Sequence, residues 1–378
     1  MTLSGTGLLD DAAALEAADP QGMLPAIASG AAQVREAAVL SGEAGLSRLA
    51  DEGRPRAIVV CGMGGSGIAG DVLAAVVGPG CAVPVLTHRG YGLPGWVGAG
   101  DLVIAVSCSG STEETLSALA EAVKRGCRLL VVGAAGSPVA DLGARGRVVF
   151  VPVTQGRQPR ASVWSLSTPL VVAADALGLV QADAAVVEAA AAQLEQVALS
   201  CRVDADHFAN PAKALALELS GTLPVLWGTS PLAGVAAYRF ACQLNENAKT
   251  VATWGVLPEA NHNQVVAFDG PSTGGPAGER DLFADRADET ELAPLRLVLL
   301  RDTDEHPQVA RRTQVSHELA RERGIEVSTV RTEGASTFER LVSIVGVTDW
   351  ASAYLALLEG RDPTPVDAIT ELKARIRA

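Results

Sequence analysis

Short apolar runs alternate with longer amphipathic stretches from residue 57 onward. Five such runs, each followed by Gly, Ser or Pro, are predicted to be strands: residues 57–62 (AIVVCG), 83–88 (VPVLTH), 102–107 (LVIAVS), 128–133 (RLLVVG) and 147–153 (RVVFVPV). Helix-like segments are expected between the first four runs, and a helical pattern over residues 22–50 precedes them all. Fully apolar strands that alternate with helices are typical of a parallel sheet covered on both faces. The pattern therefore predicts an α/β domain.

The same order of elements restarts after a mostly helical, Ala-rich passage over residues 165–220. Strands are predicted at 223–228, 295–300 and 326–331, and helices at about 232–249, 307–323 and 337–359, with a closing helix from about Val366. Both halves open with a strand followed by Gly, Ser and a helix (AIVVCGMGGSG and LPVLWGTSPLAG), which suggests a weak internal duplication. We expect two domains, 1–155 and 156–378, each a mostly parallel sheet with helices on both faces. Residues 269–293, rich in Gly, Pro and acids, are predicted to form a surface loop or flexible insertion.

Composition excludes several classes of protein. The net charge of −13 argues against a nucleic-acid partner, because Lys and Arg dominate binding to phosphate backbones. No apolar run reaches about 18 residues, and the amino-terminal stretch carries acids where a signal peptide would carry bases, so we expect no membrane span, no signal peptide and a cytoplasmic protein. The six cysteines show no CxxC spacing, and no His stands at metal-ligand spacing. Reduced cysteines, no metal and no disulfide framework are therefore expected.

The first candidate site follows the first strand, where Gly62, Gly64 and Gly67 satisfy a GxGxxG pattern before a helix. A dinucleotide site of this kind needs an acid at the end of the second strand to hold the ribose. That strand ends in Thr87, His88 and Arg89 instead, so NAD is disfavoured and only an NADP variant stays open through Arg89. A tight turn without any ligand is the other reading of this loop.

A second candidate loop follows the strand at 102–107 and strengthens the case for an anion. Ser107, Ser109, Ser111, Thr112 and Thr115 surround a glycine at the start of a predicted helix. Hydroxyl groups and free backbone N–H groups at a helix N-terminus form a cradle suited to a phosphate dianion. Helix capping alone is the alternative, although so many hydroxyls exceed what a cap requires. Both loops follow parallel strands and should lie together at the carboxyl edge of the sheet.

Six sequence motifs resemble those of one family. They are GMGGSGIAGD (62–71), SCSGSTEETL (107–116), QPRAS (158–162), QLNENAK (243–249), PEANHNQVV (258–266) and GRDPTPVDAITELK (360–373). The chain resembles the bifunctional phosphoglucose/phosphomannose isomerases, which have the sugar isomerase (SIS) fold. The resemblance implies two SIS subdomains, no cofactor and a homodimer whose sites lie between subunits. It also implies a hexose 6-phosphate substrate held by the residues Gly64, Gly65, Ser66, Ser107, Ser109 and Thr112.

Aldose–ketose isomerisation requires a base, a ring-opening acid and a cation for the developing enediolate. The resemblance assigns proton transfer to Glu246 and ring opening to His262, which reaches across the dimer interface with Lys373 as its partner. Arg160 is a candidate to stabilise the enediolate through its permanent charge. The alternatives are ordinary: Glu246 could pair with Lys249 or Arg239, and Lys373 could compensate a helix dipole. His88, His207, His306 and His317 are read as surface or structural residues.

Two departures from the family pattern bear on activity. The loop reads SCSGST where SYSGNT is usual, so Cys108 replaces an aromatic residue and Ser111 an amide. After PRAS the sequence reads VWSL rather than a small residue and a Tyr, so sugar preference or rate is open to change. The leading hypothesis is an intramolecular oxidoreductase that interconverts glucose or mannose 6-phosphate with fructose 6-phosphate through a cis-enediol. The alternative is a non-catalytic phosphosugar-binding sensor or partner protein.

Overall fold

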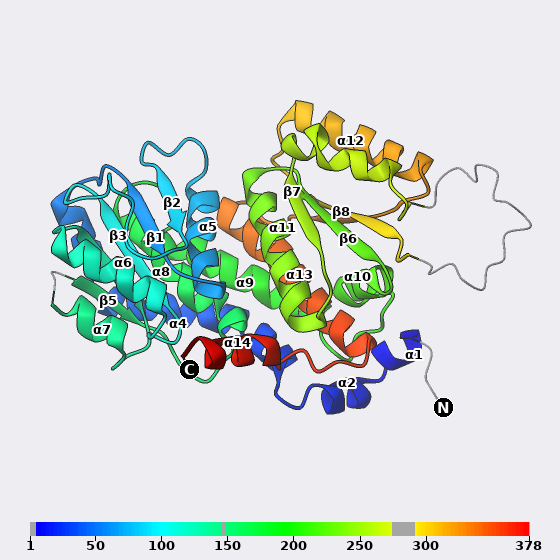
Figure 1. The fold of residues 1–378 in the computed structure, drawn as a ribbon, viewed down its shortest axis with the longest axis horizontal. Coiled ribbons are helices and arrows are strands. Elements are labelled where there is room, and N and C mark those ends of the chain that lie inside the picture. Colours follow the sequence, from blue (N-terminus) through cyan, green and yellow to red (C-terminus); the bar gives the residue numbers. More distant parts are fainter. Residues whose placement is uncertain (1–4, 146–147, 274–291, 378) are drawn as a thin grey trace, which may run out of the picture. The chain divides into compact units, whose positions relative to one another are not determined.

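The computed structural model describes residues 5–145, 148–273 and 292–377 (Figure 1). The chain forms two compact units. The five-stranded unit comprises residues 25–197 and 334–343, and the four-stranded unit comprises residues 1–24, 198–333 and 344–378. The domain boundary predicted between residues 155 and 156 stays a prediction, while packing assigns the helical residues 163–197 to the five-stranded unit. Most of the predicted insertion, residues 274–291, lies outside the described residues.

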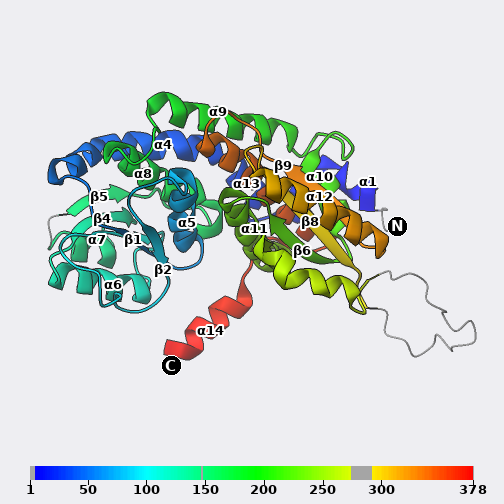
Figure 2. The same ribbon diagram turned by 90° about the horizontal axis from the view of Figure 1, so that it is seen from above.

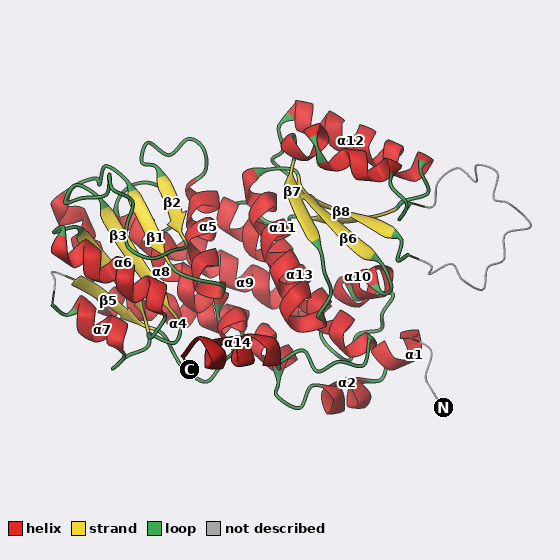
Figure 3. Cartoon of the chain, in the orientation of Figure 1, coloured by secondary structure: helices red, strands yellow, loops and turns green. Residues whose placement is uncertain are grey.

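The five-stranded unit is built on a parallel sheet with the strand order β2-β1-β3-β4-β5 (Figure 3). Its strands are β1 (Ile58–Cys61), β2 (Val85–His88), β3 (Leu102–Ser107), β4 (Arg128–Gly133) and β5 (Val148–Pro152). Its helices are α4 (Gly30–Glu43), η1 (Leu46–Glu52), α5 (Gly65–Val77), α6 (Glu113–Lys124), α7 (Pro138–Gly143), η2 (Pro159–Ala161), α8 (Val163–Ala176) and most of α9 (Ala184–Ser200). Every strand that the sequence predicts for this sheet is present.

Both faces of this sheet are buried, as its uninterrupted apolar strands require. Successive strand residues point to opposite faces. On one face, Val60 and Ile104 belong to a core with residues of η1, α5 and α8. On the other face, Val59 and Val103 pack with residues of α6 and α7. Because β1, β3, β4 and β5 each turn residues into both cores, the carboxyl edge of these strands is held by packing on both faces.

The four-stranded unit repeats this plan with the parallel strand order β7-β6-β8-β9. Its strands are β6 (Leu223–Gly228), β7 (Thr253–Val256), β8 (Leu295–Arg301) and β9 (Glu326–Arg331). Its helices include α1 (Gly5–Leu9), α2 (Ala12–Ala18), α10 (Pro211–Leu219), α11 (Pro231–Gln243), η3 (Leu244–Ala248), η4 (Glu259–His262), η5 (Gln264–Asp269), α12 (Pro307–Glu322) and α14 (Asp367–Arg377). Its order corresponds to β2-β1-β3-β4 of the other sheet, which matches the internal duplication expected from the sequence.

The helices of the four-stranded unit cover opposite faces of its sheet. Val225 and Trp227 of β6 form a core with residues of η4, η5 and α12 on one face. Alternation turns Gly228 to the other face, where an added Cβ would lie 2.3 Å from the Gly234 nitrogen of α11. A Cβ at Gly234 would in turn meet the Val256 side chain of β7 at 2.6 Å, so α11 packs tightly on that face.

Helix α13 (Thr337–Leu358) begins in the five-stranded unit and ends in the four-stranded unit. Among the described residues it is the one helix long and apolar enough to cross a membrane, but 89% of its most apolar window is buried inside the protein. Its packing is that of a core helix: Phe338 stacks edge-on against Trp164 of α8, and the Tyr354 hydroxyl donates to the Cys201 carbonyl at 2.6 Å. The N-terminal segment is tied to the four-stranded unit by Asp10, which accepts a hydrogen bond from the His207 backbone at 2.7 Å.

The α/β fold with two helix-flanked parallel sheets is confirmed, and the structure differs from the local expectations at four places. No helix separates β2 from β3, since Gly90, Gly92, Pro94, Gly95 and Gly98 disfavour one. The helix expected over 22–50 is divided into α3 (Met23–Ala28), α4 and η1, with Gly45 at φ +72°. The helix expected over 232–249 ends as a π-helix, η3. The short edge strand β7 was not predicted at all.

Candidate functional site

The turn between β1 and α5 brings backbone N–H groups to the carboxyl edge of the five-stranded sheet. Gly64 has φ +53°, and a Cβ on Gly62 would lie 2.9 Å from the Ser66 backbone, so the GxGxxG glycines allow the tight turn. Gly64 is the N-cap of α5 and provides no side-chain cap. The first N–H groups of α5 are therefore without a hydroxyl or carboxylate cap from their own N-cap residue.

The loop between β3 and α6 presents a row of hydroxyl groups beside that turn. Ser107 is fully buried, and its Oγ lies 3.1 Å from the Thr112 Oγ1, whereas Ser109 is exposed and its Oγ accepts from the Ser111 nitrogen at 3.3 Å. Thr112 is the N-cap residue of α6, yet its side chain makes no capping hydrogen bond. The capping explanation for these hydroxyls therefore does not hold at Thr112, and the α6 N-terminus is not closed by its own N-cap side chain.

Two direct contacts join three separate chain segments into one loop cluster. The Cys108 backbone N–H donates to the buried Ser66 Oγ at 3.1 Å, which links the β3–α6 loop to the start of α5. A side chain on Gly65 would meet the Pro159 carbonyl oxygen at 3.0 Å and the Arg160 Cα at 3.5 Å, so η2 lies against the same helix. Arg160 is itself 4% exposed. The predicted cradle residues and Arg160 therefore share one edge of the five-stranded unit, and we call this set of loops the cradle.

The residues that depart from the family pattern have structural environments of their own. Cys108 is buried, and its backbone carbonyl accepts from the Gln155 side chain at 3.2 Å. Burial raises the pKa of the Cys108 thiol, an effect that Ser162 and Arg157 partly oppose, so the thiol is protonated near neutral pH. Trp164 is a core residue whose side chain contacts Phe338 rather than a loop. All six cysteines are free thiols.

Arg89, the residue that kept an NADP site open, is held by the carboxylate of Asp71 on α5 in an ion pair. Thr87 also donates to Asp71, at 2.8 Å. Burial raises the pKa of the Asp71 carboxyl, while Arg89 and Thr87 act in the opposite direction. Since the guanidinium already has an anionic partner, Arg89 is poorly placed to receive the 2′-phosphate of a nucleotide.

Glu246 lies in the π-helix η3, directly after α11, and is half-buried. A π-helix inside or at the end of an α-helix is rare and is often found at functional sites. The segment ends at Lys249, which has a left-handed conformation at φ +56° although it is not a glycine. Sequence reasoning singled out Glu246 but gave no signal for this change of helical geometry.

The backbone around Glu246 is fixed by residues that are distant in sequence. Asn247 is fully buried and its Nδ2 donates to the Ser352 Oγ of α13 at 2.8 Å. Arg361 donates to the Ala248 carbonyl at 2.6 Å, and the Lys249 Nζ contacts the Asp362 carbonyl at 3.1 Å. The GRDP turn that precedes α14 therefore holds the far end of the π-helix. Arg361, Asp362 and Ser352 are positioning candidates that sequence reasoning missed.

His262 is exposed at the end of η4. Two polar side chains near it in sequence have structural partners: Asn261 donates to Ser316 at 2.8 Å, and Gln264 accepts from the Trp227 indole at 2.7 Å. The turn containing His262 belongs to the sheet face covered by η4, η5 and α12, whereas the segment containing Glu246 continues from α11 on the opposite face. The structure therefore does not bring these two residues to one face of their unit.

Lys373 is exposed on α14, which extends away from the other elements of its unit (Figure 2). The same helix exposes Ile369, Leu372 and Ile376 to the extent of 40%, 58% and 70%. Their spacing of three and four residues places them on one side of the helix. Nowhere in the described part of the chain does a group of three or more His, Cys, Asp or Glu residues suit a metal ion.

The other histidines have varied environments. His207 Nδ1 lies 2.7 Å from an Asp10 carboxylate oxygen, and His306 Nδ1 accepts from the Gln308 nitrogen at the start of α12. His88 has a buried Nε2 without a hydrogen-bond partner in the described structure, and His317 lines a cavity beside α12. His88, His207 and His317 are thus part-buried, and His306 is exposed and caps α12.

The four-stranded unit carries its own carboxylate at the position equivalent to the cradle. The loop after β8 corresponds to the loop after β3, and it contains the buried Asp302. Ser230 donates to Asp302 at 2.8 Å, and Thr332 contacts its other oxygen at 3.3 Å. The Asp302 nitrogen is satisfied by the Thr229 hydroxyl at 3.0 Å. The hydroxyl groups at this equivalent position, those of Thr229, Ser230 and Thr332, are therefore already bound to Asp302.

The chain has two parallel sheets with corresponding strand orders, and a hydroxyl-rich loop cluster lies at the carboxyl edge of one of them. These features define an α/β protein of the sugar isomerase fold. The family described as bacterial phospho-glucose isomerase C-terminal SIS domain matches residues 208–376. A bifunctional phosphoglucose/phosphomannose isomerase of Caldicellulosiruptor bescii is 31% identical over 84% of this chain and 89% of its own length. One of Aquifex aeolicus is 30% identical over 85% of this chain and 91% of its own. The chain belongs to the bifunctional phosphoglucose/phosphomannose isomerase family.

A solved structure supports the fold independently. The C-terminal domain of glucosamine-fructose-6-phosphate aminotransferase from Francisella tularensis is similar with a TM-score of 0.63. The match covers 91% of this chain and 98% of that chain at 14% sequence identity. At this identity the likeness establishes the SIS-type fold alone.

Proposed function

We propose that this protein interconverts glucose 6-phosphate or mannose 6-phosphate with fructose 6-phosphate. The observation that carries the proposal is the cradle, in which Ser66, Ser107, Thr112 and Arg160 converge from three chain segments beside two helix N-termini. Such a site favours a dianion even in a chain with a net charge of −13, because the positive helix ends act locally. Membership of the isomerase family supports the same substrate class.

The reaction we propose is an internal oxidation and reduction of the sugar. After His262 and Lys373 assist ring opening, the Glu246 carboxylate removes the proton from C2 and returns it to C1 through a cis-enediol. C2 becomes the carbonyl carbon as C1 is reduced, so no external electron acceptor is needed. Arg160 stabilises the negative charge on the enediolate oxygen. The rigid attachment of Glu246 by Asn247 and Arg361 suits a base that must reach two adjacent carbons.

We propose further that the working form is a homodimer in which His262 serves the site of the other subunit. Glu246 and His262 belong to elements on opposite faces of their sheet, which disfavours joint action within one chain. The exposed apolar side of α14, with Leu372 and Ile376, offers a surface that a second copy would cover.

Proton transfer is tested by incubating the protein with fructose 6-phosphate in deuterated water and following aldose formation by NMR. We expect deuterium at C2 of the aldose products with the wild type and none with Glu246→Gln. Phosphate affinity should persist in Glu246→Gln, because the variant leaves the cradle intact. Binding without any exchange by the wild type would favour the alternative, a phosphosugar-binding sensor.

The shared site is tested by mixing subunits of Glu246→Gln and His262→Asn after joint refolding. In a mixed dimer, one site loses both groups and the other keeps both. Random pairing makes half of the dimers mixed, so about a quarter of wild-type activity should return although each variant alone is inactive. No recovery, with dimers verified by light scattering, would place both groups in the same chain's site.

A further inference from the structure

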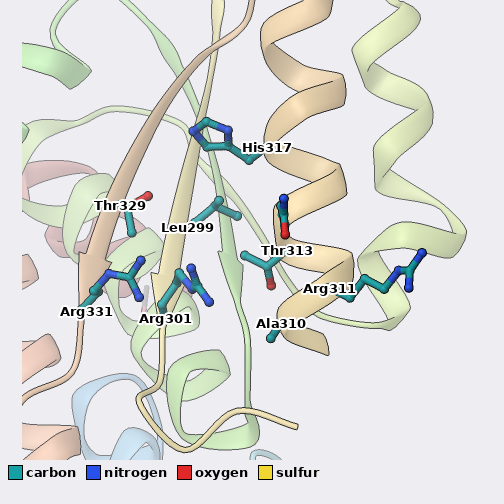
Figure 4. Close-up of a pocket in the computed structure, with 9 residues that line it drawn as sticks. Leu299, Arg301, Ala310, Arg311, Thr313, His317, Thr329 and Arg331 are labelled. Carbon is teal, nitrogen blue, oxygen red and sulfur yellow. The ribbon is translucent and has the colours of Figure 1, made fainter. Parts of the chain in front are cut away.

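A cavity of about 570 Å³ lies between α12 and the last two strands of the four-stranded sheet (Figure 4). Its strand wall consists of Leu299 and Arg301 on β8 and Thr329 and Arg331 on β9. Leu299 is paired in register with Thr329, and Arg301 with Arg331, so all four share one face of the sheet. His317 of α12 stands on the opposite wall. The two arginines therefore stand side by side at the carboxyl ends of their strands.

The charges in this cavity are not balanced by the protein. Arg301 forms an ion pair with Glu305, four residues further on. The Arg331 side chain is exposed and makes no hydrogen bond or ion pair within the described part of the chain, and like charges in register on neighbouring strands repel each other. Arg311 also lines the cavity, although Figure 4 shows its side chain directed away from the strands. The Glu305 carboxylate thus pairs with one of the two guanidinium groups, in a protein whose total charge is −13.

Donor groups of the cavity lack acceptors as well. The Arg301 Nε is buried and has no hydrogen-bond partner in the described structure. A guanidinium presents its N–H groups in a planar fork that matches two oxygens of a phosphate group. Two adjacent forks, with the exposed Thr329 hydroxyl between the strands and α12, form a donor set for a tetrahedral oxyanion.

We propose that this cavity binds the phosphate group of a small phosphorylated metabolite. Its volume falls within the usual range for small-molecule sites of about 300–1,000 Å³ and exceeds what a bare phosphate ion fills. The part-buried Ala310, above the largely covered Leu299, gives the wall an apolar part for the body of such a ligand. A metal ion is excluded as the ligand by the positive charge of the wall, and the acidity of the chain opposes nucleic acid.

This site is different from the cradle and independent of the proposed isomerase reaction. It belongs to the four-stranded unit, whereas the cradle belongs to the five-stranded unit. It is also no duplicate of the cradle, because Asp302 already fills the equivalent loop with its own carboxylate. If the cavity binds no phosphate, the isomerase proposal is therefore unaffected. If the protein is not an isomerase, the proposal for the cavity is equally unaffected.

The experiment is calorimetric titration of the full chain with inorganic phosphate at low ionic strength. Arg331→Gln removes the arginine without an ion-pair partner, and Arg331→Lys keeps the charge but not the fork. Arg321→Gln, at the last turn of α12, is the matched control for loss of one exposed positive charge. Thr112→Val reports on the cradle. Circular dichroism melting verifies that each variant is folded.

We expect the wild type and Arg321→Gln to bind two phosphates per chain and Arg331→Gln to bind one. The remaining phosphate of Arg331→Gln should be the one that Thr112→Val weakens. The affinity lost at the cavity should be at least about tenfold in Arg331→Gln, as for a charge-assisted hydrogen bond, and smaller in Arg331→Lys. Two phosphates with unchanged affinity in Arg331→Gln overturn the proposal, as does a wild type that binds none or only the phosphate sensitive to Thr112→Val.

Discussion

Replacing Ser352 with alanine should slow turnover without weakening substrate binding. Ser352 contributes the hydroxyl that accepts from Asn247, the residue next to the proposed base Glu246. Asn247 is fully buried, so loss of this acceptor strips its amide of the hydrogen bond at 2.8 Å in a place that water does not reach. The proposed base would then rest on a less well-fixed π-helix.

The expected fall in kcat is estimated from the hydrogen bond that the Asn247 amide loses in Ser352→Ala. A buried donor without its acceptor costs about 1–3 kcal/mol. If about 1.4 kcal/mol of this appears as misplacement of the Glu246 carboxylate, kcat falls about tenfold. KM for fructose 6-phosphate should stay within about twofold of the wild type, because the phosphate contacts belong to the cradle in the other unit.

Deuterium exchange into fructose 6-phosphate and steady-state kinetics measure the two quantities, and urea unfolding measures stability. Thr348→Val is the matched control, since Thr348 is equally buried on α13 but its hydroxyl donates only to backbone carbonyls of the same helix. Its stability cost should resemble that of Ser352→Ala, with kcat unchanged. Equal kcat in both variants at similar stability loss would refute the positioning role.

Two further predictions concern the five-stranded unit. Gly110→Ala should raise KM for fructose 6-phosphate severalfold and destabilise by roughly 1–2 kcal/mol, because Gly110 has φ +70° and an added Cβ would meet the Ser137 Oγ at 2.0 Å. Gly136→Ala, at φ +65° with open space around it, should lose a similar free energy of unfolding in urea but keep the wild-type KM. Equal KM values for Gly110→Ala and Gly136→Ala would contradict the steric argument. The hydrogen bonds from Arg56 lower the pKa of the buried Asp101 carboxyl, so its stabilisation is present above the ordinary pKa of 3.8 and is lost as pH falls through the lowered value. Urea unfolding of Asp101→Asn should show lower stability at pH 7 and a weaker decline below pH 4 than the wild type, and parallel declines would count against it.

The sequence predicted most strands because a strand buried on both faces must be apolar throughout. Edge strand β7 escaped this logic, since Trp254 is 42% exposed and Gly255 interrupts the apolar pattern. The stretch between β2 and β3 was misread as a helix because amphipathic spacing outweighed its glycines. These errors occur where a segment is short or exposed, so that packing rather than local pattern decides its form.

The cradle was partly predictable, because loops that follow neighbouring parallel strands must meet at one sheet edge. The partners that fix the backbone around Glu246 were not predictable. Ser352 and Arg361 form hydrogen bonds that span 105 and 113 residues of the chain. The same holds for Asp302, whose role depends on hydroxyls from two other loops. Sequence spacing carries no trace of such long-range pairs.

The interleaved composition of the two units constrains how the chain is synthesised and divided. Residues 5–24 are synthesised before the segments that they belong with, which lie within residues 198–333 and 344–377, so they must wait for their partners. The five-stranded unit has nearly all of its residues by position 197 and can mature earlier, with residues 334–343 added last. A single proteolytic nick or a truncated expression clone therefore cannot release either half intact.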